Sequence, residues 1–206
     1  MRERTVPSHF VRAALRGAQR QGHDCTAILR KAGIQLAVLD QPRARIDPEQ
    51  YGRLIQLLWE ALDDEYMGFG PVQSKRGTFA MMCHTAIHCR TLDKALRRGI
   101  LFYSLFPLAP GLQLQREGDW VRLCVDNAQL SDPDHFLAES LLVIWHRLGS
   151  WLIGQRIRLE EATFTYAEPA HIAEYDLIFP CPRRFGAGQT SLLFHARYLD
   201  LPLLQD

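Results

Sequence analysis

The spacing of apolar residues predicts a helical first part of the chain. Ser8 and Asp24 carry side-chain acceptors suited to the starts of two short helices within the first forty residues. Asp47-Pro48 predicts the start of a third helix, whose apolar residues recur every three or four positions: Tyr51, Leu54, Ile55, Leu58 and Leu62. We therefore expect a helical part over residues 1–66.

The helical spacing lapses between residues 63 and 77, where glycine and proline indicate a loop. This loop lacks the low-complexity composition of a flexible linker. Two more helices are expected after it, over residues 78–89 and 92–106, with Thr91 as the cap of the second.

Alternating apolar and polar residues predict strands in the second half of the chain. Residues 112–116 and 120–125 alternate on either side of Gly118, a pattern typical of a β-hairpin. Two further strands are expected, one over residues 157–166 and a last one over residues 191–194.

Two helices are expected between these strands. The first is long and runs from Asp132 or Asp134 to about Ile153, and the second is short. The order strand, strand, helix, strand, helix, strand is typical of an α+β fold. We therefore expect a single domain over residues 1–206, in which a helical N-terminal part precedes a small antiparallel or mixed sheet covered by helices, with the α+β core at residues 77–203.

The composition is that of an ordinary globular chain. Of the 206 residues, 47% are hydrophobic and 23% are charged, which allows a substantial buried core. The formal charge is +1 and the basic residues are not concentrated in one stretch, so the basic face of a DNA-binding domain is not expected. No stretch approaches about 20 consecutive apolar residues and the N-terminus lacks the apolar core of a signal peptide, so we expect a cytoplasmic protein without a membrane span.

Cysteine usage indicates reduced thiols, because five cysteines at irregular spacing do not make a secreted disulfide framework. Cys181 lies near Arg183 and Arg184, whose charges favour a thiolate, but no histidine is adjacent to it in the sequence. The sequence contains no phosphate loop, nucleotide fingerprint or hydrolase motif. An enzyme is therefore not expected.

The segment from Cys83 to Cys89 is the strongest local candidate for metal binding. His84 and His88 lie four positions apart, so on a helix both can reach one metal ion. The two cysteines lie six positions apart, which separates them by about 120° around a helix axis and prevents all four side chains from closing one site. We expect no metal and no cofactor, with His84 and His88 as the only weak candidates for ligands.

An ordered set of residues closes the chain. A helix with tyrosine and phenylalanine is followed by a Cys-Pro pair, a Phe-Gly-Ala turn, a strand and a final Leu-Asp-x-Pro-Leu. These positions are Tyr175, Phe179, Cys181, Pro182, Phe185, Gly186, Ala187, Leu193, Phe194, Leu199, Asp200, Pro202 and Leu203. Their order resembles the closing signature of the N-terminal effector domain of AraC-type transcriptional regulators, in the branch named arabinose-binding.

The resemblance covers about residues 32–203. Upstream it includes the start of the central helix, the start of the next helix, the hairpin turn, an acidic residue early in the long helix and the tail of that helix: Gly77-Thr78-Phe79, Thr91-Leu92, Ala95-Leu96, Gly118, Glu139 and residues 151–155. The sequence departs from the family pattern at His84, Cys89-Arg90 and Arg183-Arg184. The resemblance therefore does not extend to the identity of the effector.

The resemblance implies a ligand-sensing and dimerisation domain of a bacterial transcription regulator. Its C-terminal helix-turn-helix DNA-binding domain is then absent from this chain. A bound small molecule would shift the regulator between forms that differ in DNA binding. The expected partners are a small-molecule effector and a second copy of the chain, with DNA bound only through the absent domain.

Aromatic and sulfur-containing residues on the three central helices suggest where an effector binds. Small-molecule sites are mostly apolar with a few polar groups, so this composition favours an apolar or amphipathic effector. The expected ligand-binding residues are Phe79, Met82, Cys83, His84, Tyr103, Phe106, Trp145 and His146. Three alternatives stay open: that these residues are ordinary core, that the domain dimerises without a ligand, and that residues 83–89 form the site of a small Cys/His metal-dependent enzyme.

Overall fold

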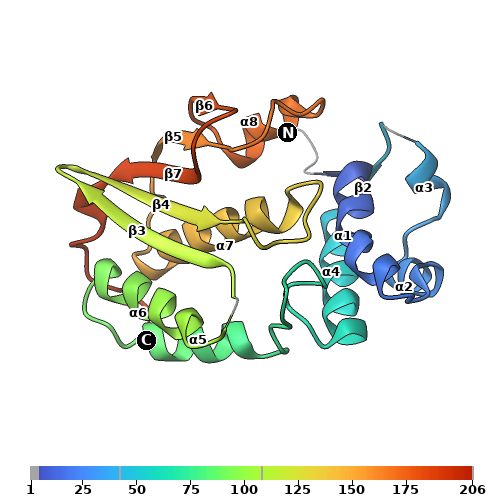
Figure 1. Cartoon of the computed structure of the whole chain (residues 1–206), viewed down its shortest axis with the longest axis horizontal. Helices are drawn as coiled ribbons and strands as arrows, with labels where there is room; N and C mark the ends of the chain where they lie inside the picture. Colours follow the sequence, from blue (N-terminus) through green and yellow to red (C-terminus); the bar gives the residue numbers. More distant parts are fainter. Residues whose placement is uncertain (1–4, 42, 108, 206) are drawn as a thin grey trace. The chain divides into compact units, whose positions relative to one another are not determined.

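The computed structural model describes residues 5–41, 43–107 and 109–205 (Figure 1). Two compact units make up the chain: Met1–Thr78 with Ser131–Phe136, and Phe79–Leu130 with Leu137–Asp206. Helices, a two-stranded sheet and a five-stranded sheet occur among the described residues, which confirms the expected α+β class.

The first unit consists mainly of helices, tied by a short antiparallel sheet. Its elements are β1 (Val6–Pro7), α1 (Ser8–Arg20), α2 (Cys25–Ala32), α3 (Ala37–Asp40), β2 (Arg45–Ile46) and α4 (Pro48–Leu62). β1 pairs with β2, with Val6 opposite Ile46 and Pro7 opposite Arg45, so the chain leading into α1 is joined to the chain leading into α4. The expected helical N-terminal part is confirmed, whereas this two-residue pairing is too short to leave an alternating pattern in the sequence.

Polar caps fix where these helices begin. Asp24 accepts a hydrogen bond from a backbone N–H in the first turn of α2. Asp47 and Gln50 form a reciprocal capping box at the start of α4. Both starts match the prediction, but the prediction for Ser8 is wrong: its hydroxyl donates to the Gln41 carbonyl and does not cap α1.

The loop over residues 63–77 is ordered around one buried carboxylate. Asp64 accepts hydrogen bonds of 2.7–2.9 Å from three backbone N–H groups, those of Tyr66, Gly68 and Ser74. The loop also approaches α1 closely, because a Cβ at Gly17 would lie only 1.7 Å from the carbonyl oxygen of Met67. Both features hold the loop in place on the helices of its unit.

The second unit contains the five-stranded sheet. Its strands lie side by side in the order β3-β4-β7-β5-β6. Their bounds are β3 (Gly111–Glu117), β4 (Trp120–Asp126), β5 (Leu159–Thr163), β6 (Arg183–Arg184) and β7 (Thr190–His195). All neighbouring pairs are antiparallel except β5 and β6, which are parallel. The expected hairpin around Gly118 is confirmed, and the last long strand of the sequence lies at the centre of the mixed sheet.

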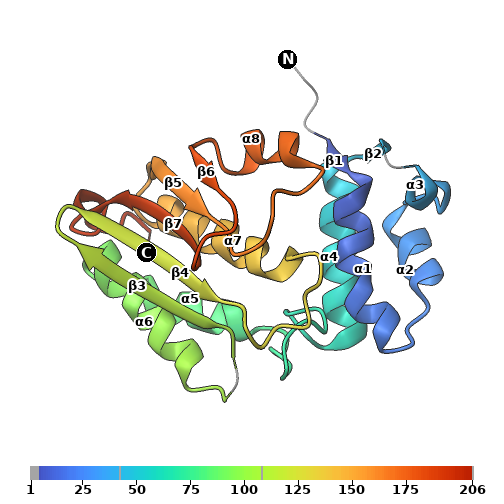
Figure 2. The ribbon, with the colours of Figure 1, turned by 45° about the horizontal axis from the view of Figure 1, so that its top comes forward.

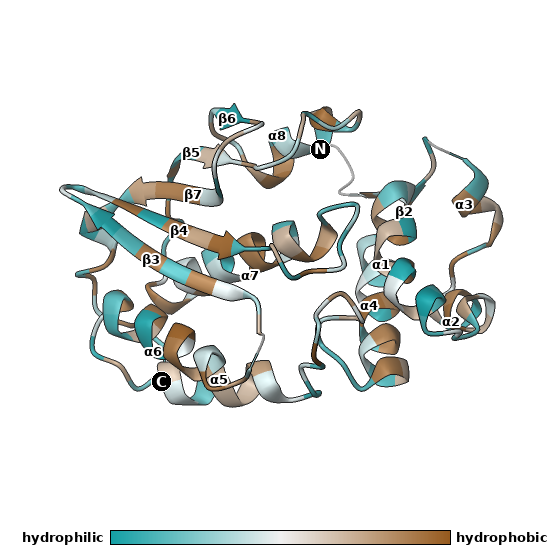
Figure 3. Cartoon of the chain, viewed as in Figure 1, coloured by the Kyte–Doolittle hydropathy of each residue, from teal (hydrophilic) through white to brown (hydrophobic). Residues whose placement is uncertain are grey.

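One face of this sheet is apolar. Val121 and Leu123 of β4 lie opposite Phe194 and Leu192 of β7, and all four side chains are buried. The helices α6 (Leu92–Ser104) and α7 (Phe136–Leu152) lie on the same side of the sheet, and Figure 3 shows hydrophobic residues along much of β7 and the end of β4 (Figures 1–3). The period of two along the strands therefore places their apolar residues toward the helices.

The other face of the sheet carries a polar network. The Arg122 guanidinium lies 3.4 Å from the Glu161 carboxylate and donates to the Ser191 hydroxyl at 3.2 Å. The hydroxyls of Ser191 and Thr163 are 2.7 Å apart. Neighbouring strands thus satisfy one another's polar side chains on this face.

Three elements of the second unit differ from the prediction. α5 (Thr78–Ala86) ends three residues early, and α7 starts after His135, whose positive φ of 58° lies outside the helical region. The closing helix is a 3₁₀ turn, Ile172–Glu174, that continues into the four-residue α8 (Tyr175–Ile178). The two-residue β6 falls where only a turn was expected.

The C-terminal strap, residues 199–205, caps the start of α6. The carbonyl groups of Leu199 and Leu201 accept hydrogen bonds from the backbone N–H groups of Asp93 and Leu92, at 2.9 and 3.0 Å. These N–H groups belong to the first turn of the helix, where they have no intrahelical acceptor. Thr91 precedes α6 but its side chain makes no capping hydrogen bond, so the strap takes the role predicted for Thr91.

The same strap also binds the end of α7. The Leu204 backbone N–H donates to the Leu152 carbonyl at 2.8 Å, and the Gln205 side-chain amide donates to the Trp151 carbonyl at 2.9 Å. The Leu152 carbonyl lies at the end of the helix, where intrahelical donors are missing, so the strap supplies its donor. The Trp151 carbonyl also accepts from the Gly154 backbone N–H at 3.0 Å, so the strap gives it a second donor. The strap therefore joins the first turn of one helix to the last turn of another.

Candidate ligand site

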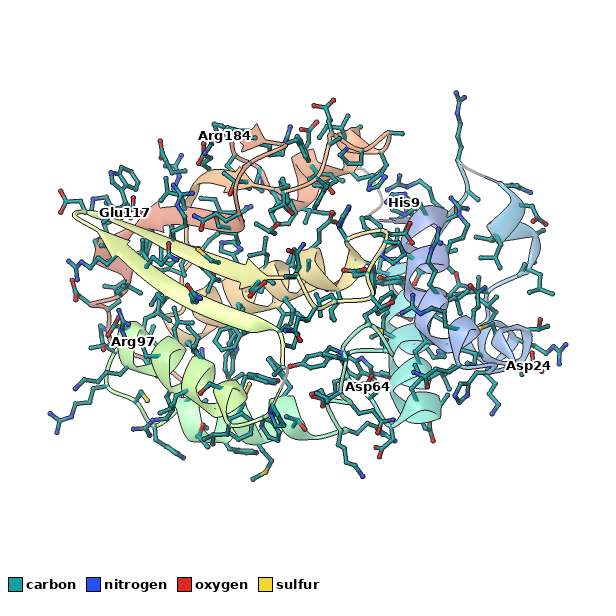
Figure 4. All side chains as sticks on the ribbon, viewed as in Figure 1. His9, Asp24, Asp64, Arg97, Glu117 and Arg184 are labelled. Atoms are coloured by element: carbon teal, nitrogen blue, oxygen red, sulfur yellow. The ribbon has the colours of Figure 1, made fainter. Side chains whose placement is uncertain are left out.

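The residues predicted to bind a ligand come from three helices of the second unit, whose side chains Figure 4 includes. α5 carries four of them, α6 one and α7 two, and Phe106 lies just after α6: Phe79, Met82, Cys83 and His84; Tyr103; Trp145 and His146. The hairpin of β3 and β4 separates α7 from α5 and α6 in the sequence, so a contact of α7 with either helix is a tertiary contact.

Met82, Tyr103 and Trp145 form a buried group around Gly99. The rings of Tyr103 and Trp145 meet edge to face with their centroids 6.3 Å apart. A Cβ at Gly99 would lie 2.6 Å from the Trp145 ring and 2.9 Å from the Met82 sulfur. The missing side chain at Gly99 therefore leaves the space that the indole ring and the thioether fill, and three of the predicted residues are in one place.

Phe106 extends this group toward the surface. Its ring centroid lies 6.5 Å from that of Tyr103 and 5.4 Å from that of Phe102, and its side chain is 42% exposed. The aromatic residues thus run from a buried indole to a ring that solvent reaches. An amphipathic molecule prefers such a gradient, because its apolar part loses water while its polar part keeps it.

The α5 residues divide between the interior and the surface. Met82 is buried and Phe79 and Cys83 are half-buried, whereas His84 and His88 are exposed. Within the described part of the chain, no group of three or more histidine, cysteine, aspartate or glutamate side chains is placed to hold a metal ion. Of the predicted residues on α5, Met82 is therefore the one that is fully buried.

His146 makes a structural hydrogen bond. Its Nε2 lies 2.8 Å from the Ile157 carbonyl oxygen, and the nearby Ser150 hydroxyl accepts from the Ile157 backbone N–H at 3.1 Å. Burial lowers the pKa of His146, although the hydrogen bond to Ile157 acts in the opposite direction. The neutral ring therefore ties α7 to the segment that leads into β5.

A second buried group, which the sequence did not predict, surrounds Glu139 on α7. The Glu139 carboxylate accepts hydrogen bonds from the hydroxyls of Tyr166 and Tyr175, and those two hydroxyls are 3.1 Å apart. Burial and then the negative charge of Glu139 raise the pKa of Tyr175. Three aromatic rings surround the tyrosines, with centroids 5.3–6.0 Å from those of the tyrosine rings: Phe164, Phe179 and Phe185.

The sequence contained only indirect signals for this second group. An acid in the first turn of a helix is favourable by itself, so Glu139 gave no reason to expect a buried partner. Tyr175 lies 36 positions away from it and fits the apolar side of a short helix. Both residues belong to the resemblance described above, and their hydrogen bond gives a physical reason for their joint presence.

Burial also decides the chemistry of Cys181. It raises the pKa of this thiol to about 11, even though the charge of Arg183 lowers it. A thiol with this pKa is almost fully protonated near pH 7, so Cys181 lacks the thiolate that a nucleophile needs. Its place beside β6 is that of a packed turn.

Comparison with known proteins identifies the family. The family described as the arabinose-binding domain of AraC transcription regulators, N-terminal, matches residues 22–203. The chain belongs to this family. An ornithine utilization regulator from Pseudomonas aeruginosa is 22% identical to the AraC-type domain over 200 residues, which are 96% of this chain and 59% of the relative. The chain thus spans a little over half the length of that regulator.

A solved structure gives a weaker likeness to this AraC-type domain. The transcriptional regulator CdpR from Pseudomonas aeruginosa aligns over 86% of this chain and 56% of its own, with a TM-score of 0.47 and 14% identity. The family match alone therefore confirms the resemblance found in the sequence and gives the AraC-type domain a role in transcription regulation. No helix among the described residues is long and apolar enough to cross a membrane.

Proposed function

We propose that this AraC-type domain senses a small apolar or amphipathic molecule through the group formed by Met82, Tyr103, Phe106 and Trp145. The observation that supports this most is the meeting of three helices at a buried aromatic group whose outer member, Phe106, is partly exposed. The proposed site also keeps four other residues on the same helices: Phe79, Cys83 and His84 of α5, and His146 of α7. The domain uses no cofactor and catalyses no reaction in this proposal.

Sensing would act through a population shift. A molecule that binds between the helices and favours one arrangement of them stabilises the form of the regulator that contains it. The response would reach DNA through a C-terminal helix-turn-helix domain, and the regulator would act as a homodimer. The family membership supports the regulatory role, and the low basic charge of this chain supports a separate DNA-reading domain.

Thermal-shift screening of this chain against apolar and amphipathic metabolites tests the proposal. A ligand present at 100 times its Kd adds about 2.7 kcal/mol to the free energy of unfolding, which raises Tm by several degrees. Ornithine belongs in the screen because of the relative's name, and we expect a smaller shift from it than from an apolar compound. Phe106→Ser removes the aromatic ring at the exposed end of the group and is expected to reduce the shift in Tm.

The matched control is Leu177→Ser, which removes an exposed apolar side chain on α8 and is expected to leave the shift unchanged. A shift that Phe106→Ser does not alter would place the ligand elsewhere. If no compound shifts Tm, the alternative of a ligand-free dimerisation domain gains support. Two exposed leucines favour that alternative: Leu101 on α6 and Leu105, one turn later and just after the helix. Light scattering of wild type and of Leu101→Ser would test whether they mediate dimerisation.

A further inference from the structure

Four exposed arginines surround the segment that leads from α7 into β5. Arg156 and Arg158 flank the buried Ile157 in an extended stretch of this segment, so their side chains leave the backbone on the side opposite to it. Arg147 lies on α7, and Arg197 lies shortly after β7. Within the described part of the chain, none of the four forms an ion pair with a carboxylate. We call these four residues the arginine cluster.

Tyr198 connects two members of the cluster. It ends the 3₁₀ turn Ala196–Tyr198, and its hydroxyl oxygen accepts hydrogen bonds from the Arg158 backbone N–H at 3.3 Å and from the Arg197 guanidinium at 3.5 Å. The hydrogen bond from Arg197 lowers the pKa of Tyr198, burial raises it, and the charges of both arginines lower it further. Both guanidinium groups therefore act on one hydroxyl.

His146 connects the other two members. Its Nε2 lies 2.8 Å from the carbonyl oxygen of Ile157. Burial lowers the pKa of His146, and the charges of Arg156 and Arg147 lower it as well, so both guanidinium groups lie near this ring. The Ile157 carbonyl and the Arg158 N–H belong to the same peptide group. The two halves of the cluster therefore meet at one peptide bond.

The hydroxyl of Tyr198 still has a proton to donate. Tyr198 is only 5% exposed and its oxygen accepts from two donors, yet none of the described groups accepts its proton. The Arg197 guanidinium lies over the Tyr198 ring, 5.1 Å from the centroid, and this contact holds its charge near the hydroxyl in advance of any ligand. A hydroxyl donor beside two guanidinium groups is suited to an anionic oxygen.

We propose that the arginine cluster binds a compact anion, a small molecule that carries phosphate or several carboxylate groups. Arginine suits both groups, because its planar guanidinium can donate two parallel hydrogen bonds to either. Arg156, Arg158, Arg197 and the Tyr198 hydroxyl bind the anion, and Arg147 adds charge at the edge of the site. This site goes beyond the proposed apolar site and does not depend on it, since its ligand is recognised by charge.

Acidic residues near the cluster favour a compact anion over a nucleic acid. Glu160 and Asp200 are exposed and lie close to the cluster in the sequence. The backbone carbonyl of exposed Asp119 accepts from the Ala196 N–H at 2.7 Å, beside the turn that carries Arg197. A long phosphate backbone laid across the cluster would meet these carboxylates, whereas a small anion can contact the arginines alone.

Isothermal titration of this chain with pyrophosphate and with citrate tests the proposal, at an ionic strength kept constant with chloride. We expect one or both anions to bind with a Kd of about 1 mM or lower, because several charge-assisted hydrogen bonds act together. Binding of pyrophosphate alone would indicate a phosphorylated ligand, and binding of citrate alone a carboxylate ligand. Absence of binding by both anions up to about 10 mM would overturn the proposal.

Single variants test the location of the site. Arg156→Gln and Arg158→Gln each remove one exposed charge and are expected to weaken anion binding about fivefold or more. Arg53→Gln, at an exposed position of α4, removes the same charge outside the cluster and is expected to leave the Kd unchanged. An equal loss in Arg53→Gln and Arg158→Gln would show that the anion responds to net charge alone, which would overturn the site.

The hydroxyl and the size of the ligand have their own tests. Tyr198→Phe keeps the ring and removes the proton donor, so it is expected to weaken anion binding several-fold. Arg156→Gln locates the site even if Tyr198→Phe fails to fold, because the Arg156 side chain is exposed and makes no hydrogen bond to the described residues. Tighter binding of duplex DNA than of pyrophosphate and citrate at the same ionic strength would contradict a site for a compact anion.

Discussion

Gly99 sets the distance between the helices of the candidate site. Gly99 lies within α6 and has no positive φ, so a glycine is needed there for its missing side chain and not for an unusual backbone angle. Trp145 and Met82 occupy the space that any larger residue would need. Close packing of this kind transmits small volume changes, because protein interiors have few voids that absorb them.

Gly99→Ala is therefore expected to destabilise the domain. Overpacking of a filled core costs about 1–3 kcal/mol, which outweighs the gain in helix propensity of about 1 kcal/mol or less. Urea unfolding measures the loss of free energy. Gly188→Ala is the matched control because no atom lies within 4 Å of the added Cβ, and a similar loss in both variants would contradict the role assigned to Gly99.

The hydroxyl of Tyr175 is expected to stabilise the domain because it donates to the buried Glu139 carboxylate. Tyr175→Phe keeps the ring and removes this donor, so we expect a loss of about 1–3 kcal/mol near pH 7. Chemical unfolding with tryptophan fluorescence measures it. Full wild-type stability in the variant would show that Tyr166 alone satisfies the carboxylate.

The same tyrosines predict a pH dependence. Burial raises the pKa of Tyr175 and of Tyr166 in the folded state above the usual value near 10. The unfolded chain therefore loses these protons first, so stability is complete below pH about 10 and falls as pH rises above it. Unfolding measured between pH 8 and 11 should show a smaller fall in Tyr175→Phe. Tyr198→Phe should not reduce the fall, because the pKa of Tyr198 is lowered.

At this scale the sequence predicted residue types better than partners. Met82, Tyr103 and Trp145 were expected together because apolar helix faces must meet, and they do. The contact of Glu139 with Tyr166 and Tyr175 was not expected, because residues that distant along the chain are joined only by the tertiary fold.

Helix starts are the elements that the sequence defines best. α4 begins at Asp47-Pro48 as predicted, because an acceptor cap and a proline in the first position are both local requirements. α6 also begins where expected, but its cap comes from the strap, which no local pattern reveals. α7 begins later than expected because residues 132–135 before it form a turn, in which His135 has a positive φ.

Short elements were the hardest to predict. β6 has two residues and α8 has four, so neither contains a full period of its own pattern. Pairing of β6 with β5 instead determines its structure, and that pairing is parallel. The hairpin of β3 and β4, with seven residues in each strand and a glycine turn, was predicted because its signal is long and local.

The cap of α4 gives a prediction for an element. Asp47→Ala removes the acceptor for the Glu49 backbone N–H, at 2.7 Å, and half of the capping box. The expected cost is about 0.5–2 kcal/mol of unfolding free energy, measured in urea. Asp47→Ser keeps an acceptor at the same position and should recover most of it; an equal loss in both variants would show that the charge and not the cap is responsible.

The whole chain carries little net charge, which decides its behaviour with DNA. At +1, with 24 basic and 23 acidic residues, it offers no excess of basic charge to neutralise the phosphates of a duplex. We expect this chain alone to show no binding to duplex DNA at micromolar concentrations and 150 mM salt, measured by fluorescence anisotropy. Binding that weakens steeply as salt is raised would contradict the assignment of DNA contact to a separate domain.

The strap has a consequence for the order in which the chain acquires its structure during translation. The first turn of α6 leaves the ribosome well before residues 199–201, whose carbonyl groups cap it. At about 5–20 residues per second, roughly a hundred residues take about 5–20 s to synthesise. Until then these two N–H groups lack the acceptors that the folded domain gives them, so the nascent chain holds a helix start that residues 199–201 complete. A ribosome stalled before Leu199 would therefore carry a domain more open to proteolysis at α6 than one stalled after Gln205.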